Sequence, residues 1–100
     1  MQLNIQKSGS AWTLGLTGDF SFNDNDQIRT AVESITADHP NDVTVELSGL
    51  SNMDSAGLGM LLLLKDAVDE VGGKIRLKGP SGQVARLLDV SRYGELMDIN

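Results

Sequence analysis

Two stretches near the start of the chain alternate apolar and polar residues with a period of two. Leu3 and Ile5 alternate with polar neighbours, and the same pattern recurs over residues 12–16. Alternation of this kind is typical of a strand with one buried face. The short polar turn at residues 8–10 therefore predicts that the chain opens with a β-hairpin.

A helical period then replaces the alternation. Apolar residues recur at positions 28, 31, 32 and 35, which fall on one face of a helix. Asn23, Asp24 or Asn25 can provide its N-cap, and Pro40 ends it because proline disfavours helical geometry in the preceding residue. That preceding residue is His39, the only histidine. We interpret it as a favourable charge at the helix end rather than as a catalytic residue or a ligand.

A strand and a second helix follow. Apolar residues at positions 43, 45 and 47 alternate with polar ones and predict a strand, and residues 48–52 have the composition of a turn. Apolar residues at positions 61, 64, 68 and 71 then share one face of a helix that begins near Ser55. Glycines at positions 72 and 73 end this helix.

The last third of the chain adds a strand, a helix and a short tail. Ile75 and Leu77 mark the strand, and basic residues alternate with them, as is common on an edge strand. Ser81 is a suitable N-cap for a third helix with apolar positions 84, 87 and 88, and residues 96–99 form a short final element. The order ββαβαβα plus a C-terminal element predicts one α/β domain over residues 1–100.

Composition narrows the functional classes. The 100 residues suffice for one core, and the absence of cysteine excludes disulfides and thiolate metal sites. The apolar run 60–64 is far shorter than the roughly 20 residues of a membrane span, so we expect a soluble, cytoplasmic protein that does not bind membranes. The net charge is −6, and residues 1–64 hold two basic and eight acidic residues. This balance argues against nucleic acid but allows a partner with a basic surface.

The segment 53–60, with the sequence MDSAGLGM, is the centre of the candidate chemistry. Ser55 has the place of an N-cap for the second helix. Gly57 and Gly59 in the first turn each lower helix propensity by about 1 kcal/mol relative to alanine, which suggests that a strand or a partner protein approaches the backbone closely. Asp54 adds a carboxylate beside the hydroxyl, and a helix N-terminus favours added negative charge. Ser55 is thus either a helix cap or a hydroxyl that can be modified.

A second row of the same helix contains Ser55, Leu58 and Leu62 and ends in charged residues. We therefore expect Leu58 and Leu62 to be partly exposed beside Ser55, as a docking surface for a protein would require. Met60 is expected near the rim of this surface. The leucines at positions 61, 63 and 64 are expected in the core.

The six residues DSAGLG at 54–59 resemble the signature of STAS domains (sulphate transporter and anti-sigma factor antagonist), specifically the small stand-alone antagonists. The order of elements is similar to the STAS fold over essentially the whole chain, which implies a small mixed β-sheet with helices. In that family the hydroxyl residue directly after the aspartate is phosphorylated, and Ser55 has this position. The residues expected to support the phosphosite are Asp54, Gly57, Asp19 and Asp24. The residues expected to bind the partner are Met53, Ala56, Leu58, Gly59 and Leu62.

One position departs from the family pattern. STAS antagonists often carry an aspartate a few residues after the glycine at position 18, close to the phosphorylated serine. The equivalent residue here is Ser21, which leaves open whether Asp19 or Asp24 takes over that role. With Asp26 these carboxylates would be the candidates for a cation site, but acidic loop residues are commonly solvated or capping, and we predict no metal site.

The resemblance implies an anti-sigma factor antagonist. The unphosphorylated chain would bind an anti-sigma factor and free a sigma factor. That anti-sigma factor would be a serine kinase of the GHKL type, which phosphorylates Ser55 and ends the complex, and a PP2C-type phosphatase would restore it. ATP and Mg²⁺ then belong to the kinase, while this chain needs no cofactor and is a monomer when free.

An enzyme and a scaffold are the other two functional classes. An enzyme is not predicted, because the chain has no cysteine, one histidine outside any catalytic pattern, no phosphate-binding GxxxxGK loop and no evident base for Ser55. The alternative to the switch is a constitutive STAS scaffold, a subunit of a lipid or anion transporter or of a stress-signalling complex. In that alternative Ser55 would only cap its helix.

Overall fold

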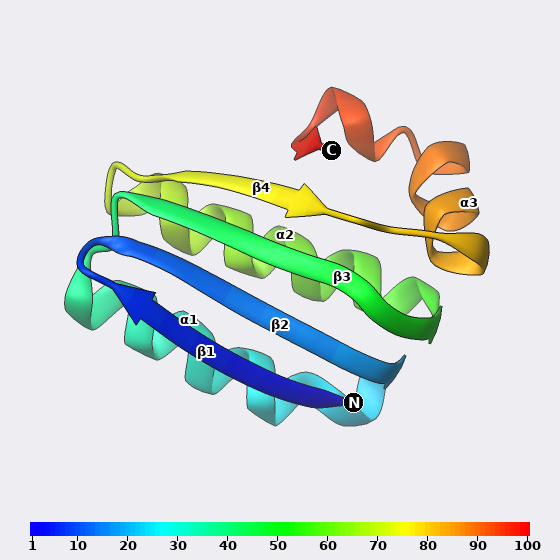
Figure 1. Cartoon of the computed structure of the whole chain (residues 1–100), viewed down its shortest axis with the longest axis horizontal. Coiled ribbons are helices and arrows are strands. Elements are labelled where there is room, and N and C mark those ends of the chain that lie inside the picture. The colour runs from blue at the N-terminus through cyan, green and yellow to red at the C-terminus, as the bar shows by residue number, and fades with distance from the viewer.

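The computed structural model describes residues 1–100, which form one five-stranded sheet with the spatial order β1-β2-β3-β4-β5 (Figure 1). β1 runs antiparallel to β2, whereas the strands from β2 to β5 run parallel to one another. The predicted opening hairpin and mixed sheet are therefore confirmed. The strands are β1 (Gln2–Ser8), β2 (Ala11–Phe20), β3 (Asp42–Met53), β4 (Lys74–Lys78) and β5 (Asp98–Ile99).

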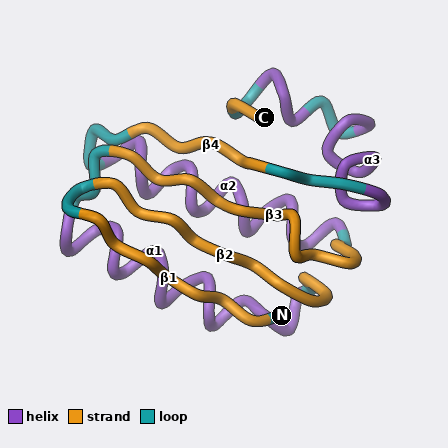
Figure 2. The backbone as a smooth tube through the Cα atoms, viewed as in Figure 1, coloured by secondary structure: helices purple, strands orange, loops and turns teal.

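Three α-helices connect the parallel strands. They are α1 (Asn25–Asp38), α2 (Ser55–Glu70) and α3 (Gly82–Val90), and two short 3₁₀ turns, η1 (Phe22–Asp24) and η2 (Tyr93–Glu95), precede α1 and follow α3. α1 and α2 lie side by side behind one face of the sheet, and α3 lies beyond the carboxyl end of β4, next to the end of β3 (Figures 1 and 2). The predicted order ββαβαβα is confirmed. None of the helices is both long and apolar enough to cross a bilayer.

The core lies between the sheet and the two helices behind it. Alternate residues of each strand point to opposite faces, so every second residue of β2 and β3 meets α1 or α2. The other face, turned toward the viewer in Figure 1, carries no helix and holds polar residues such as Thr13 and Thr44. This one-sided burial explains why the strands were visible as period-two patterns. The fully buried residues include Leu14, Leu16, Val43, Val45, Leu47, Leu77, Ile28, Ile35, Leu61 and Leu64.

Two expectations about strands were wrong. Residues 48–52, predicted as a turn, continue β3 to Met53, because they pair with the equally polar end of β2 through two register shifts. β4, predicted as an edge strand, has β5 as its outer neighbour, with Arg76 opposite Asp98. The basic residues that alternate with apolar ones along β4 point to the open face of the sheet. There the Arg76 guanidinium lies 3.0 Å from a carboxylate oxygen of Asp42.

The entry to α1 differs from a simple cap. Asp24 has the N-cap position, but its carboxylate makes no capping bond to α1. It is buried and closes η1 instead, accepting the Ser21 N–H at 2.8 Å and lying 3.3 Å from the amino group of Met1. At the other end, His39 closes α1 with a left-handed backbone and donates its N–H to the backbone oxygen of Ile35.

Replacing Asp24 tests this buried carboxylate. Asp24→Ala leaves the Ser21 N–H without its partner, and we expect the free energy of unfolding to fall by about 1–3 kcal/mol. Urea unfolding followed by the fluorescence of the single tryptophan measures the change. Asp26→Ala is the matched control, because Asp26 is exposed in the first turn of α1 and its loss should cost less than about 1 kcal/mol. Equal losses for the two variants would contradict the structural role of Asp24.

Candidate functional site

The candidate site lies at the carboxyl edge of the sheet, where β3 passes through Asp54 into α2 (Figures 1 and 2). The Asp54 N–H donates to the backbone oxygen of Phe20 at 3.1 Å, so this turn is fixed beside the end of β2. One residue pair further back, the Asn52 side-chain amide donates to the Asp19 carboxylate at 3.2 Å. The edge at which α/β proteins commonly place their sites is thus formed here by two adjacent strand ends.

The N-cap of α2 is Asp54, whereas the sequence pattern predicted Ser55. Asp54 has an extended backbone, and its carboxylate accepts the Gly57 N–H at 3.1 Å, a bond shared with its own backbone oxygen at 3.0 Å. Both residue types are good caps, and the helix begins one residue earlier than predicted. Ser55 is therefore the first helical residue, and its exposed hydroxyl has no hydrogen-bond partner within the chain.

The two glycines of the first turn have different surroundings. A Cβ atom at Gly57 would lie 2.4 Å from Met53 Cγ and 3.3 Å from the Phe20 ring, so the expected close approach is found there. A Cβ atom at Gly59 would meet nothing within 4 Å, so no element of this chain approaches Gly59 closely. Met53 is buried under the turn. It supports the site from below and cannot be one of its partner-binding residues.

The exposed side of α2 beside Ser55 carries an apolar surface, which we call the α2 strip. Leu58 and Leu62 are half-buried, as expected, while Met60 is buried rather than at the rim. Leu63 was expected in the core but is 45% exposed, because four consecutive leucines span more of the helix circumference than the buried face can take. The strip consists of Ala56, Leu58, Gly59, Leu62 and Leu63.

A further exposed apolar residue was not foreseen. Phe22 lies in η1, two residues after the strand end to which the Asp54 N–H is bound, and is 70% exposed. The only signal in the sequence is an aromatic residue inside an otherwise polar loop. Phe22 adds apolar surface to the same edge of the sheet.

The two loop aspartates have different environments. Asp24 is buried and engaged with Ser21 and Met1, so it is not available at the surface as a supporting residue of the site. Asp19 is exposed and bound to Asn52. Ser21 caps η1 through its hydroxyl, which accepts the Asn23 N–H at 3.4 Å. No group of three acidic, histidine or cysteine side chains is arranged to hold a metal ion.

Two residues that sequence reasoning missed reach the turn from the C-terminal part of the chain. The Gln83 side chain forms two hydrogen bonds of 2.8 Å with the backbone N–H and C=O of Met53. The Tyr93 hydroxyl donates to the backbone oxygen of Leu58. Burial raises the pKa of Tyr93. Neither residue is marked by any pattern in the sequence, because each acts on the backbone across 30 or more positions.

Comparison with known proteins identifies relatives over the full length. The family model described as "Mlab, STAS domain" matches residues 3–98. A "STAS-domain containing protein" of Pseudomonas aeruginosa is 33% identical over 92 residues, which cover 92% of this chain and 90% of that protein. An "Anti-sigma F factor antagonist" of Paenibacillus polymyxa is 26% identical over 100 residues, which cover 99% of this chain and 86% of that protein.

Two solved structures of one antagonist are similar in fold. The unphosphorylated form of the anti-sigma factor antagonist SpoIIAA matches with a TM-score of 0.77 at 20% identity, covering 99% of this chain and 87% of that one. The phosphorylated form of SpoIIAA from Bacillus matches with a TM-score of 0.75 at 21% identity, covering 99% and 91%. At these identities the similarity concerns the fold alone.

Alanine substitutions at the two glycines should change stability in opposite directions. Gly57→Ala forces a Cβ atom against Met53, and we expect a loss of about 1–3 kcal/mol from overpacking. Gly59→Ala fills open space inside a helix and should gain about 0.5–1 kcal/mol. Urea unfolding of both variants measures the difference. A loss at Gly59 equal to that at Gly57 would contradict the described packing.

The alkaline titration of Tyr93 tests its burial. Tyr93 is the only tyrosine, so tyrosinate absorbance reports on it alone. We expect a midpoint above the value of about 10 for a free tyrosine, returning to about 10 in denaturant. Because the folded-state pKa is the higher one, the stability that neutral Tyr93 contributes is complete below pH ~10 and is lost as the pH rises through the folded-state pKa. Tyr93→Phe should show a smaller alkaline loss, and a folded midpoint of 10 or lower would contradict the burial.

Proposed function

Because this chain belongs to the STAS domain family, we propose that it is an anti-sigma factor antagonist whose binding surface is switched by phosphorylation of Ser55. Relatives named as such antagonists support the general role. The observation that carries the specific assignment is the free, exposed hydroxyl of Ser55 beside the apolar α2 strip. Unphosphorylated, the chain binds an anti-sigma factor through this surface, and the sigma factor is released.

The partner enzymes follow from the same proposal. The anti-sigma factor is a serine kinase of the GHKL type that binds ATP and Mg²⁺, and it phosphorylates Ser55. A PP2C-type phosphatase removes the phosphate. The chain itself is a cytoplasmic binding protein, a monomer when free, and contributes an acceptor hydroxyl rather than a catalytic group or a cofactor.

The position of Ser55 explains how a phosphate could be accepted without refolding. Phosphate adds about −1.5 to −2 charge and three acceptor oxygens. At the first residue of α2 it meets the helix dipole and unpaired N–H groups of the first turn, which favour negative charge. The similarity of this chain to SpoIIAA in both its unphosphorylated and phosphorylated forms supports a switch within one fold.

The same phosphate is unfavourable in the complex. It would bring a hydrated dianion to the α2 strip, next to the carboxylate of Asp54. Taking such a charge out of water without a partner is costly. A loss of only about 3 kcal/mol would weaken binding more than a hundredfold. Phosphorylation is therefore expected to exclude the partner without changing the fold of this chain.

The surroundings of the strip indicate the chemistry of the partner. Beyond the strip, α2 exposes Asp66, Asp69 and Glu70. Lys65 is the one base there, and its hydrogen bond to the Asp69 carboxylate raises its pKa. The matching surface on the anti-sigma factor should thus have an apolar centre and a basic rim.

The constitutive scaffold is the second candidate, for a specific reason. The matching family model is named "Mlab, STAS domain" and the Pseudomonas relative is named only for its STAS domain, so neither name refers to a sigma factor. Neighbouring genes separate the two candidates. Kinase and phosphatase genes favour the switch, whereas permease and ATPase genes favour the scaffold.

Substitutions at Ser55 test the switch directly. Ser55→Asp should weaken binding to the anti-sigma factor kinase that binds the wild-type chain by at least about a hundredfold, a change of roughly 3 kcal/mol, measured by calorimetry. Ser55→Ala should bind but accept no phosphate. Ser8→Asp is the matched control, since Ser8 is an exposed serine at the opposite edge of the sheet, and it should bind like the wild type. Full affinity of Ser55→Asp would refute the proposal.

A further inference from the structure

The end of β3 lacks a neighbouring strand on one side. β4 pairs with β3 only as far as Glu46 and Lys78, whereas β3 continues to Met53. In a parallel ladder the backbone groups of successive residues point alternately to the two sides. The Asp54 N–H points to Phe20 on the β2 side, so the N–H and C=O of Met53 point to the side where no strand lies. Buried backbone groups of this kind need partners.

Gln83 provides both partners. Its Nε2 donates to the Met53 oxygen at 2.8 Å, and its Oε1 accepts the Met53 N–H at 2.8 Å. A side-chain amide carries a donor and an acceptor like a peptide group, so Gln83 takes the place of the missing strand residue. It lies in the first turn of α3 and thereby binds that helix to the residue two positions before Ser55.

Tyr93 holds the same turn from its other end. Its hydroxyl donates to the backbone oxygen of Leu58, three positions after Ser55. The Tyr93 side chain is buried, so its orientation is set by its packing. The short backbone segment from Met53 to Leu58 is therefore bound at both ends by side chains from the C-terminal part of the chain.

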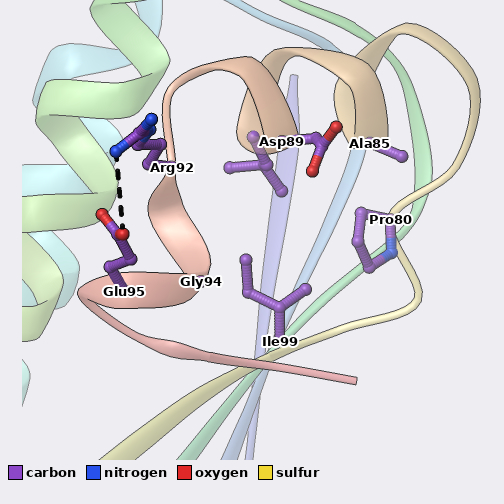
Figure 3. A pocket seen from close by; sticks show the side chains of 8 residues that line it. Pro80, Ala85, Asp89, Arg92, Gly94, Glu95 and Ile99 are labelled. Carbon is purple, nitrogen blue, oxygen red and sulfur yellow. Dashed lines mark ion pairs between the residues drawn. The ribbon is translucent and has the colours of Figure 1, made fainter.

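α3 is weakly packed on another of its faces. A cavity of about 490 Å³ lies between α3, η2 and β5, and Pro80, Ala85 and Ile99 are among the residues that line it (Figure 3). The ion pair between Arg92 and Glu95, which also line this cavity, is 4.0 Å long and largely exposed to solvent, so it adds little stability. The place of α3 therefore depends on its buried residues Val84 and Leu88 and on the bonds from Gln83.

On the basis of the proposed function, we infer that Gln83 and Tyr93 are positioning residues for Ser55. They hold the backbone that presents its hydroxyl to the kinase and the α2 strip to the partner. The C-terminal layer of α3 and η2 is thus part of the switch. Phosphoryl transfer depends strongly on the placement of the acceptor, since a misplacement of about 1 Å can lower a rate about a hundredfold.

The test uses two substitutions of Gln83 in the full chain. Gln83→Leu removes both hydrogen bonds. Gln83→Glu keeps the shape but loses the donor when the introduced carboxyl group is ionised and regains it when the group is protonated. Leu87→Ala is the control, because Leu87 is a half-buried residue of the same helix that makes none of the hydrogen bonds to Met53.

Two readouts are compared. The first is amide hydrogen exchange and the nitrogen-15 shifts of Met53 and Ser55. Gln83→Leu should speed exchange at Met53 at every pH, whereas Gln83→Glu should return to wild-type shifts as the pH falls through the titration of its carboxyl group. The second is the kcat/KM for phosphorylation by the kinase that modifies the wild-type chain. Gln83→Leu should lower it about tenfold or more, Tyr93→Phe should lower it less, and Leu87→Ala should leave it near wild type.

Either readout can overturn the inference. Unchanged exchange and shifts at Met53 and Ser55 in Gln83→Leu would overturn the inference whatever the kinase does. So would a kcat/KM for Gln83→Leu equal to that of Leu87→Ala, or the absence of a pH-dependent recovery in Gln83→Glu. If the wild type accepts no phosphate, the proposed function fails on its own, while the exchange measurements still decide whether Gln83 positions the turn.

Discussion

The hydrogen bond between the Asp54 carboxylate and the Gly57 N–H is the interaction on which the site depends. Because Asp54 caps α2, the hydroxyl of Ser55 is not needed for capping and lies exposed at the first helical residue. The close packing of Gly57 on Met53 then fixes the first turn against the core. If Ser55 were the N-cap, its hydroxyl would accept a backbone N–H of the first turn, and no free hydroxyl would remain at this edge of the sheet to accept a phosphate.

The rest of the fold supports this turn from three directions. The β2 end binds the Asp54 N–H, the core below holds Met53, and the C-terminal layer binds Met53 and Leu58 through two side chains. The backbone of the turn is therefore held by hydrogen bonds and packing, while its outer surface is apolar and exposed. This combination suits the proposed switch, in which a phosphate on Ser55 would change the affinity of the surface through its charge.

Sequence patterns predicted the elements well because the sheet is covered on one face, so burial follows a period of two in strands and 3.6 in helices. These patterns failed where the local residues suit two arrangements equally well. Asp54 and Ser55 are equally good caps, four leucines in a row do not reveal that Leu63 is exposed, and the polar end of β3 has the composition of a turn. The contacts of Gln83 and Tyr93 were invisible, since they join backbone groups far away in the chain.

The most direct measurement of the central claim is the location of an added phosphate. The full chain is incubated with its candidate serine kinase, ATP and Mg²⁺, and the mass of the protein and of its peptides is determined while its fold is followed by circular dichroism. The account predicts a single phosphate on Ser55 and an unchanged spectrum. A phosphate on any other residue, no phosphate, or a loss of folded structure on modification of Ser55 would contradict it.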